Sequence, residues 1–249
     1  MAKNASPRIW TNTLRLWRNA KSVVIGRFQC ARLEVDLEAC NRLGIDVLRR
    51  FSGGGTVYHD LGNLNYSINV RKDSLVGVAS QSQFFDLLLQ GVVESLSSLG
   101  VSASPEASRG IWMEGKKLSG IAGFTSRVSY FGHGTLLVNS NLEHIRRILR
   151  PAGSRDPRGP VRSIPSPVIN LSTLMGSQVS IETIKEALVS GVEKVFRCSF
   201  VTKGTTLKET QLAEKLYEQR CHYNACSPCC PVIRCISLPA CPYKELKHT

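Results

Sequence analysis

The chain has 249 residues, of which 42% are hydrophobic and 20% are charged, a composition typical of globular proteins. This apolar content suffices for a sizeable core, and at about 150 residues per domain the length predicts one or two domains. No apolar run approaches the roughly 18 residues that span a bilayer, and the opening MAKNASPRIW lacks the apolar stretch of a secretory signal. We therefore expect a cytoplasmic protein that does not enter a membrane.

Charge is the strongest compositional signal, because 32 basic and 19 acidic residues give a net charge of +13. A field of this sign attracts nucleic acids, nucleotides and acidic proteins alike, and it does not choose among them. The basic residues are spread from Arg8 to Lys247 and do not gather in one tail. A generally basic surface is therefore at least as good an interpretation as a nucleic-acid groove.

The hydrophobic pattern predicts both strands and helices, and hence an α+β fold. The predicted strands are, in chain order, Ser22–Gly26, Ile45–Leu48, Asn63–Val70, Lys117–Gly123 and Val128–Asn139. The predicted helices are Gln83–Leu99, Asn141–Leu149, Ser180–Phe196 and Glu209–Gln219. Strict alternation of apolar and polar residues over Asn63–Val70 is typical of a strand that is buried on one face only.

The segment RRFSGGGTVYHDLGNLNYS, residues 49–67, contains three consecutive glycines. Glycine weakens a strand, but its backbone N–H groups are unobstructed and can surround an anionic or acyl ligand. The segment matches neither the P-loop nor the dinucleotide-binding glycine pattern. On its own, a glycine triplet indicates either a ligand loop or a plain bulge.

Two adjacent lysines, Lys116 and Lys117, follow Glu114–Gly115 and precede a stretch of apolar and small residues. Neighbouring side chains of an extended strand point to opposite faces, so only one lysine would face a site. A lysine that faces inward needs an anion, such as a phosphate or a carboxylate. Taken alone, two lysines after a turn are more often the solvated edge of a hairpin.

Four blocks of sequence together resemble the lipoate–protein ligase A family, especially its short archaeal type. They are RRFSGGGTVYHDLGNLNYS, GKKLSG, HGTLLVN and RSIPSPVINL, in that order between Ile9 and Gln219. The resemblance implies a biotin/lipoate protein ligase catalytic domain over residues 1–220, with a class II aminoacyl-tRNA synthetase-like mixed sheet and flanking helices. It also implies an enzyme that uses ATP with Mg²⁺ to activate lipoate to lipoyl-AMP and transfers the lipoyl group to a lysine of a lipoyl carrier domain.

The resemblance further implies roles for individual residues. Lys117 is the implied catalytic residue, since an ammonium group between the lipoate carboxylate and the α-phosphate would stabilise the approach of two anions. The implied ATP and acyl-adenylate site consists of Arg50, Gly55, Thr56, Val57, Tyr58 and Lys117. The implied lipoyl site consists of Gly54, His59 and His133. Arg150–Pro167 corresponds to the loop that covers the adenylate, and the metal ligands are not identified.

The implied partners are lipoyl domains of 2-oxoacid dehydrogenase complexes or the glycine cleavage H protein. Little of the first strand and helix of the family fits before Ile9, and the chain has no room for the C-terminal accessory domain of longer ligases. We therefore expect a separate small accessory subunit, which would bias the adenylate-covering loop toward its closed state.

Residues 221–249 form a cysteine-rich tail that we do not expect to be an independent domain. Six of the nine cysteines lie there: Cys221, Cys226, Cys229, Cys230, Cys235 and Cys241. A Cys-x-x-Cys pair is half of a zinc site, but a second pair is missing and Cys229 and Cys230 are adjacent. The spacing therefore does not favour zinc.

Three other functions compete with the ligase. An octanoyltransferase of the same fold needs an activated thiol near the lysine, yet no cysteine lies between Cys40 and Cys198. A biotin ligase would carry a GRGRxGRxW-type loop, which is absent. A basic nucleic-acid-binding domain would be a non-enzymatic alternative, but no zinc-finger, RNP or helix-turn-helix pattern supports it.

Overall fold

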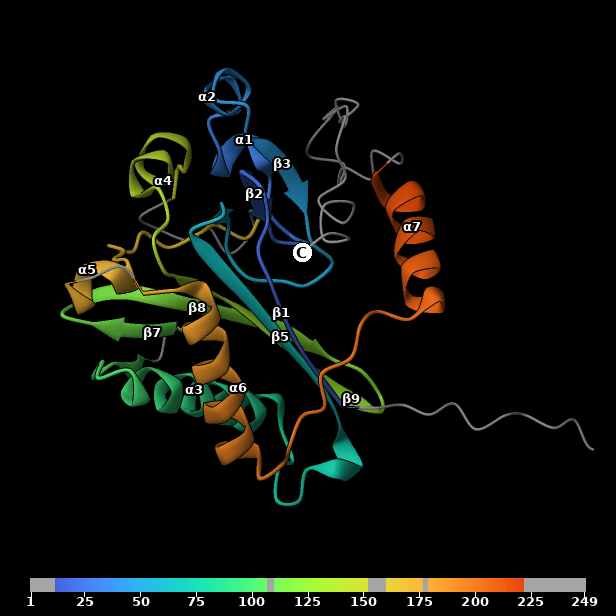
Figure 1. Ribbon diagram of the computed structural model, residues 1–249. Helices are drawn as coiled ribbons and strands as arrows, with labels where there is room; N and C mark the ends of the chain where they lie inside the picture. The colour runs from blue at the N-terminus through green and yellow to red at the C-terminus, as the bar shows by residue number, and fades with distance from the viewer. Residues whose placement is uncertain (1–11, 107–109, 152–159, 177–178, 222–249) are drawn as a thin grey trace, which may run out of the picture. The chain divides into compact units, whose positions relative to one another are not determined.

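The computed structural model describes residues 12–106, 110–151, 160–176 and 179–221, and it divides the chain into two compact units (Figure 1). Of the described residues, unit 1 comprises 12–18, 62–106, 110–140, 166–176 and 179–198, and unit 2 comprises 19–61, 141–151, 160–165 and 199–221. Each unit is thus assembled from separated stretches of the chain. The α+β class predicted from the sequence is confirmed.

Unit 1 is built on a six-stranded antiparallel sheet with the spatial order β1-β5-β9-β8-β7-β6. The strands are β1 (Thr13–Trp17), β5 (Asn63–Arg71), β6 (Ser104–Glu106), β7 (Gly110–Met113), β8 (Lys116–Thr125) and β9 (Ser129–Leu137). The three strands predicted here from sequence correspond to β5, β8 and β9, which pair with one another at the centre. The outer strands β1, β6 and β7 are short, and the sequence pattern did not reveal them.

Two long helices, α3 (Gln81–Ser98) and α6 (Ile181–Phe196), lie side by side on one face of this sheet (Figure 1). Both were predicted, and Ser80 and Ser180 begin them as N-caps. Their axes approach closely at a glycine: a Cβ atom on Gly191 would lie 2.2 Å from Ser95 Oγ. A Cβ atom on Gly132 of β9 would lie only 2.7 Å from Leu88, which shows that α3 packs directly on the sheet.

The opposite face of the sheet carries glycines and polar side chains. Residues paired across strands share a face, so Asn65, Thr135, Gly120 and Gly110 form one row across four strands. Asn65 is only 1% exposed and Asn63 is fully buried, although the alternation predicted a strand buried on one face only. The Asn63 amide donates a hydrogen bond of 3.0 Å to Asn65 Oδ1, so each asparagine supplies part of the other's hydrogen bonding.

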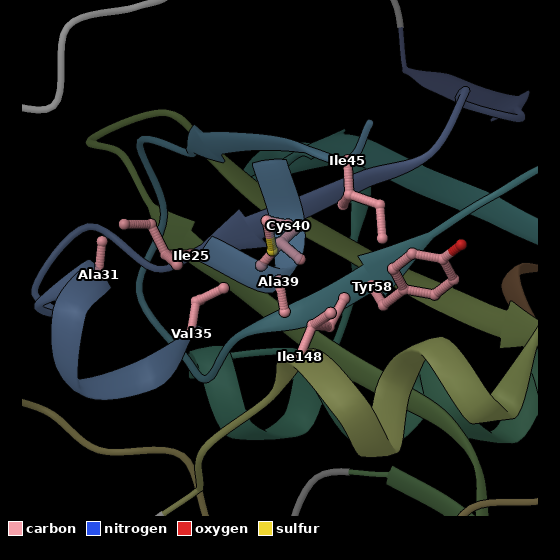
Figure 2. Close-up of a cluster of buried hydrophobic side chains, with 9 residues drawn as sticks. Ile25, Ala31, Val35, Ala39, Cys40, Ile45, Tyr58 and Ile148 are labelled. Atoms are coloured by element: carbon pink, nitrogen blue, oxygen red, sulfur yellow. The ribbon is translucent and has the colours of Figure 1, made fainter. Parts of the chain in front are cut away.

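Unit 2 contains a three-stranded sheet with the order β3-β2-β4. Its strands are β2 (Ser22–Ile25), β3 (Asp46–Arg49) and β4 (Val57–His59), and β2 runs parallel to β3 and antiparallel to β4. The helices α1 (Ala31–Glu34), α2 (Leu37–Arg42) and α4 (Leu142–Ile148) pack with this sheet around a hydrophobic cluster (Figure 2). The cluster consists of Val23, Ile25, Ala31, Val35, Ala39, Cys40, Ile45, Tyr58 and Ile148.

Three shorter or terminal elements complete the described chain: η1 (Lys72–Ser74), α5 (Leu171–Met175) and α7 (Leu207–Cys221). Helix α7 was predicted two residues shorter at each end. Asn141 caps α4 as predicted, because its side chain accepts a hydrogen bond from the His144 N–H. Within the described part of the chain, no helix is both long and apolar enough to cross a membrane.

Candidate functional site

The glycine segment Gly53–Thr56 of unit 2 is held by one arginine. The Arg50 guanidinium donates to the Gly53 carbonyl from Nε at 3.1 Å and from Nη2 at 2.6 Å. It also donates to the Gly55 carbonyl at 2.7 Å and to the Val24 carbonyl of β2 at 3.1 Å. These four bonds use all but one of the five N–H donors of the side chain. Burial lowers the pKa of Arg50 to about 10, so the group remains charged at neutral pH.

These hydrogen bonds from Arg50, which we call the Arg50 clamp, determine which way the backbone N–H groups of the segment point. A trans peptide places the N–H opposite to its C=O, so binding of the Gly53 and Gly55 carbonyls directs the N–H groups of Gly54 and Thr56 away from Arg50. Within the described residues, the N–H groups of Gly53, Gly54 and Gly55 donate no hydrogen bond. Unpaired N–H groups in succession are suited to binding an anion.

The turn at residues 26–29 packs against the glycine segment and is fixed by two polar side chains. Arg49 Nη1 donates to the carbonyls of Gly26 and Gln29 at 3.0 and 2.6 Å. Buried Gln29 accepts the Gly26 N–H at 2.8 Å and the Thr56 hydroxyl at 3.0 Å. A Cβ atom on Gly26 would lie 2.1 Å from the Gly54 carbonyl oxygen, so this contact requires glycine. Gly54 itself has φ +89°, which also favours glycine.

A buried carboxylate joins residues 162–163 to the same segment. The Glu34 side chain is fully buried and forms an ion pair with Arg162 Nε at 2.7 Å. It also accepts the Ser163 N–H at 3.1 and 3.2 Å, and it shares the single Thr56 hydroxyl proton with Gln29, at 3.2 Å. Sequence reasoning did not single out Gln29, Glu34 or Ser163 individually, although Ser163 lies within the quoted RSIPSPVINL block.

The residues that follow the glycines form β4 and face several directions. Tyr58 is a buried member of the hydrophobic cluster of unit 2 and lies at its edge in Figure 2. Its hydroxyl lies 2.8 Å from His144 Nδ1. Burial raises the pKa of Tyr58, so the phenol stays neutral. His59 is buried, and its Nδ1 accepts a hydrogen bond of 2.8 Å from the Asn19 amide, which leaves the proton of a neutral ring on Nε2. Val57 is half-buried and pairs with Val24.

Unit 1 holds the other two residues that the sequence indicated, Lys117 and His133. Lys116 is exposed whereas Lys117 is half-buried, which agrees with the predicted alternation. The Lys117 side chain lies over two glycines: Cβ atoms on Gly110 and Gly120 would lie 2.5 and 3.3 Å from its Cε atom. His133 lies on the same sheet face as Gly120, two residues along β9 from Thr135, and its ring centroid is 5.6 Å from that of Phe131.

The backbone of Lys117 is fixed on both sides. On one side it pairs with Trp112 of β7, next to a β-bulge. On the other, its N–H donates to the Pro167 carbonyl at 2.7 Å and its carbonyl accepts the Ile169 N–H at 3.1 Å. Residues 167–169 of the RSIPSPVINL block therefore hold the lysine of the GKKLSG block, two motifs that are far apart in the sequence.

The Lys117 ammonium group is desolvated without being paired. Burial lowers the pKa of Lys117, and the negative charge of Glu106 opposes this shift only in part. Its Nζ lies 5.9 Å from the centroid of the Trp112 ring, within the range of a cation–π interaction. Among the described residues, none forms a hydrogen bond or an ion pair with Lys117 Nζ. An ammonium group in this state is suited to receive an anion.

The three described cysteines outside α7 do not resemble activated nucleophiles. Cys30 and Cys40 are buried, and burial with the nearby Asp36 carboxylate raises the pKa of Cys40 to about 11. Burial and Glu193 also raise the pKa of Cys198. Cys226, Cys229, Cys230, Cys235 and Cys241 lie outside the described residues. In the part that is described, no group of three or more His, Cys, Asp or Glu side chains could hold a metal ion.

The Arg150–Pro167 segment has fixed ends. Arg150 Nη2 forms an ion pair of 2.6 Å with Asp36, and Arg162 pairs with Glu34. These two arginines therefore have partners within unit 2. Residues 152–159, which include the other two arginines of the expected adenylate-covering loop, lie outside the described residues.

Comparison with known proteins defines the class of protein. Residues 2–193 match the family model of the lipoyl protein ligase A/B catalytic domain. The chain belongs to this family, in agreement with the resemblance noted from its motifs.

Individual relatives of the chain are lipoate-protein ligases. The chain is 32% identical to lipoate-protein ligase A subunit 1 of Thermoplasma acidophilum over 217 residues, which are 83% of this chain and 80% of that protein. It is also 32% identical to a lipoate-protein ligase of Bacillus subtilis, over 71% of this chain but only 52% of that protein. The chain thus spans about half the length of the longer relatives.

Two solved structures share the fold. A lipoate-protein ligase A bound with ATP superimposes with a TM-score of 0.72 at 31% identity, covering 84% of this chain and 82% of that one. A bipartite lipoate protein ligase described with its E2 lipoyl domain, from Thermoplasma acidophilum, gives a TM-score of 0.71 at 29% identity, covering 84% and 80%.

The first prediction concerns the clamp on the glycine segment. Arg50→Lys should lower the free energy of unfolding by about 2–4 kcal/mol, because a single ammonium cannot reach three carbonyls and leaves buried acceptors unpaired. Urea unfolding followed by circular dichroism measures the change. The matched control is Arg42→Lys, whose side chain is 68% exposed and should tolerate the substitution. A loss below about 0.5 kcal/mol at Arg50 would contradict the clamp.

The second prediction concerns the pH dependence of stability. The folded-state pKa of Lys117 lies below its unfolded value of 10.5, so the charged form destabilises the fold at neutral pH. This penalty disappears as the pH rises from the folded pKa to 10.5. Lys117→Met should therefore be more stable than the wild type at pH 7, by a margin that shrinks toward pH 10.5. Urea unfolding across this range tests the effect, and Lys116→Met, at an exposed position, should show no such trend.

Proposed function

We propose that the chain is the catalytic part of an ATP-dependent lipoate–protein ligase, which forms lipoyl-AMP and transfers the lipoyl group to a lysine of a carrier domain. The observation that carries this proposal is a pair of anion-binding features in a chain of this family. One is the row of unpaired N–H groups in the glycine segment, and the other is the unpaired ammonium of Lys117.

The first half-reaction joins two anions. A carboxylate oxygen of lipoate attacks the α-phosphorus of ATP, the bond to the β-phosphate breaks, and pyrophosphate leaves. Lys117 would contact the carboxylate oxygen and the α-phosphate together, so that its positive charge offsets the charge that accumulates as they approach. A compact ammonium suits this position better than the planar fork of arginine.

The glycine segment would bind the adenylate through its backbone. The N–H groups of Gly54 and Gly55 would donate to the adenylate, while Thr56, Val57 and Tyr58 would shape the site through their main chain. Arg50 would act indirectly, because most of its donors hold the loop carbonyls. Its remaining N–H could still donate to a phosphate. His59 and His133 would border the lipoyl chain.

In the second half-reaction the ε-amine of the carrier lysine attacks the acyl carbon of lipoyl-AMP. An amide bond forms, the amine loses a proton and AMP leaves. The proposed carriers are lipoyl domains of 2-oxoacid dehydrogenase complexes or the glycine cleavage H protein, and the net charge of +13 favours acidic carriers. Mg²⁺ would accompany the phosphates of ATP.

Adenylate formation tests the proposal directly. With ATP and lipoate, Lys117→Ala should reduce the release of pyrophosphate at least ~100-fold, because a charge at the reacting atoms is removed. Lys116→Ala, at the adjacent exposed position, should retain activity within a factor of about three, and Lys117→Arg should remain poor. Wild-type protein that binds ATP and lipoate but releases no pyrophosphate, both alone and with the small subunit of a bipartite ligase, would refute the ligase assignment. Equal losses in both alanine variants would refute the role of Lys117.

We also propose a separate accessory subunit, in view of the relative named as subunit 1 of a ligase. Mass spectrometry of a lipoyl domain incubated with ATP, lipoate and this chain should show little lipoylation. Addition of the small subunit of a bipartite ligase should raise it at least ~10-fold. Full turnover by the chain alone would show that no second subunit is needed.

A further inference from the structure

Several hydrogen bonds hold Ser163 against the glycine segment. Its hydroxyl oxygen accepts the Thr56 N–H at 2.8 Å and the Gln29 amide at 3.0 Å. Its own N–H donates to both oxygens of the buried Glu34 carboxylate. The Thr56 N–H and the Gln29 amide thus fix the hydroxyl, and Glu34 fixes the main chain of the same residue. All three are distant from Ser163 in the sequence.

The proton of this hydroxyl has no acceptor among the residues that the structure describes. A serine oxygen accepts two hydrogen bonds and donates one, and here both acceptor positions are filled. Accepting two N–H groups polarises the hydroxyl and makes it a better donor. Ser163 is half-buried and is therefore not sealed within the core.

The hydroxyl lies on the ligand-binding side of the glycine segment. Arg50 binds the Gly55 carbonyl, and the Thr56 N–H in the same peptide points the opposite way, toward Ser163 Oγ. A Cβ atom on Gly55 would lie 3.1 Å from that oxygen, so the close approach also explains why glycine suits position 55. The Gly54 N–H is likewise directed away from Arg50. Ser163 therefore adds a side-chain donor to a row of backbone donors.

We propose that Ser163 is a substrate-binding residue that donates its hydroxyl proton to an oxyanion. The inference rests on the proposed function, and the oxyanion is either a phosphate of the nucleotide or the carboxylate of lipoate. The local charge permits an anion, because Arg162 neutralises Glu34 and Arg49 and Arg50 add positive charge nearby. Glu34 and Gln29 act as positioning residues, since they hold Ser163 and do not themselves present a donor to the substrate.

Calorimetric titration of the full chain with ATP alone and with lipoate alone tests the proposal. Ser163→Ala should weaken the binding of one of these ligands roughly 10- to 100-fold, as expected for loss of a hydrogen bond to a charged group. The affected ligand identifies the oxyanion. Ser163→Thr retains a hydroxyl and should recover most of the affinity. The matched control is Ser172→Ala, which removes a half-buried serine of unit 1 whose hydroxyl makes a long bond of 3.3 Å.

The outcomes separate this proposal from the ligase assignment. If wild-type protein forms lipoyl-AMP while Ser163→Ala binds both ligands normally, the hydroxyl donates only to water and the proposal is overturned. Equal weakening by Ser163→Ala and Ser163→Thr would instead mean that the residue acts through packing, which also overturns it. Should the alanine variant unfold, Ser163→Cys preserves the shape with a much weaker donor and should show the same selective loss.

Discussion

The hydrogen bonds from Arg50 to the carbonyls of Gly53 and Gly55 are the interaction on which the proposed nucleotide site depends. A run of glycines has no side chains with which to fix its own conformation, and it loses more conformational entropy on ordering than any other sequence. One guanidinium supplies what the segment lacks, because its planar set of donors can reach several carbonyls at once. The same contacts turn the N–H groups of Gly54 and Thr56 away from Arg50, and the Thr56 N–H then donates to Ser163 Oγ.

At Lys117 burial removes water from the ammonium group, and no described residue forms a hydrogen bond or an ion pair with it, although the Trp112 ring lies near. Glycines at positions 110 and 120 leave space for its alkyl chain, and the bridge to residues 167–169 fixes its main chain. The unpaired charge costs stability in the ligand-free chain, and a bound anion would recover that cost. The buried charge of Lys117 therefore both lowers the stability of the ligand-free fold and favours the binding of an anion.

The sequence predicted the elements whose pattern is local and failed where burial depends on distant residues. Alternation identified β5, and apolar spacing with serine caps identified α3 and α6. Alternation could not foresee that Asn63 and Asn65 would be buried beside their apolar neighbours, because that depends on what covers the strand. The glycine and lysine motifs pointed to anion binding, but the role of Ser163 depends on a bond to Gln29, 134 residues away, and no local pattern encodes it.

The interleaved order of the two units constrains how the chain can be made and shortened. Unit 1 begins with β1, which cannot pair until β5 has been synthesised. Unit 2 is completed only by Ile148 and Ser163, which follow β9 in the chain. Neither unit can therefore be completed on the ribosome before residues of the other have emerged, and folding driven by such long-range pairing is slow. A nascent chain that ends after β9 would lack α6 from unit 1 and α4 from unit 2. Each unit therefore depends on segments that flank the other, so neither can be expressed or exchanged as a single continuous piece of chain.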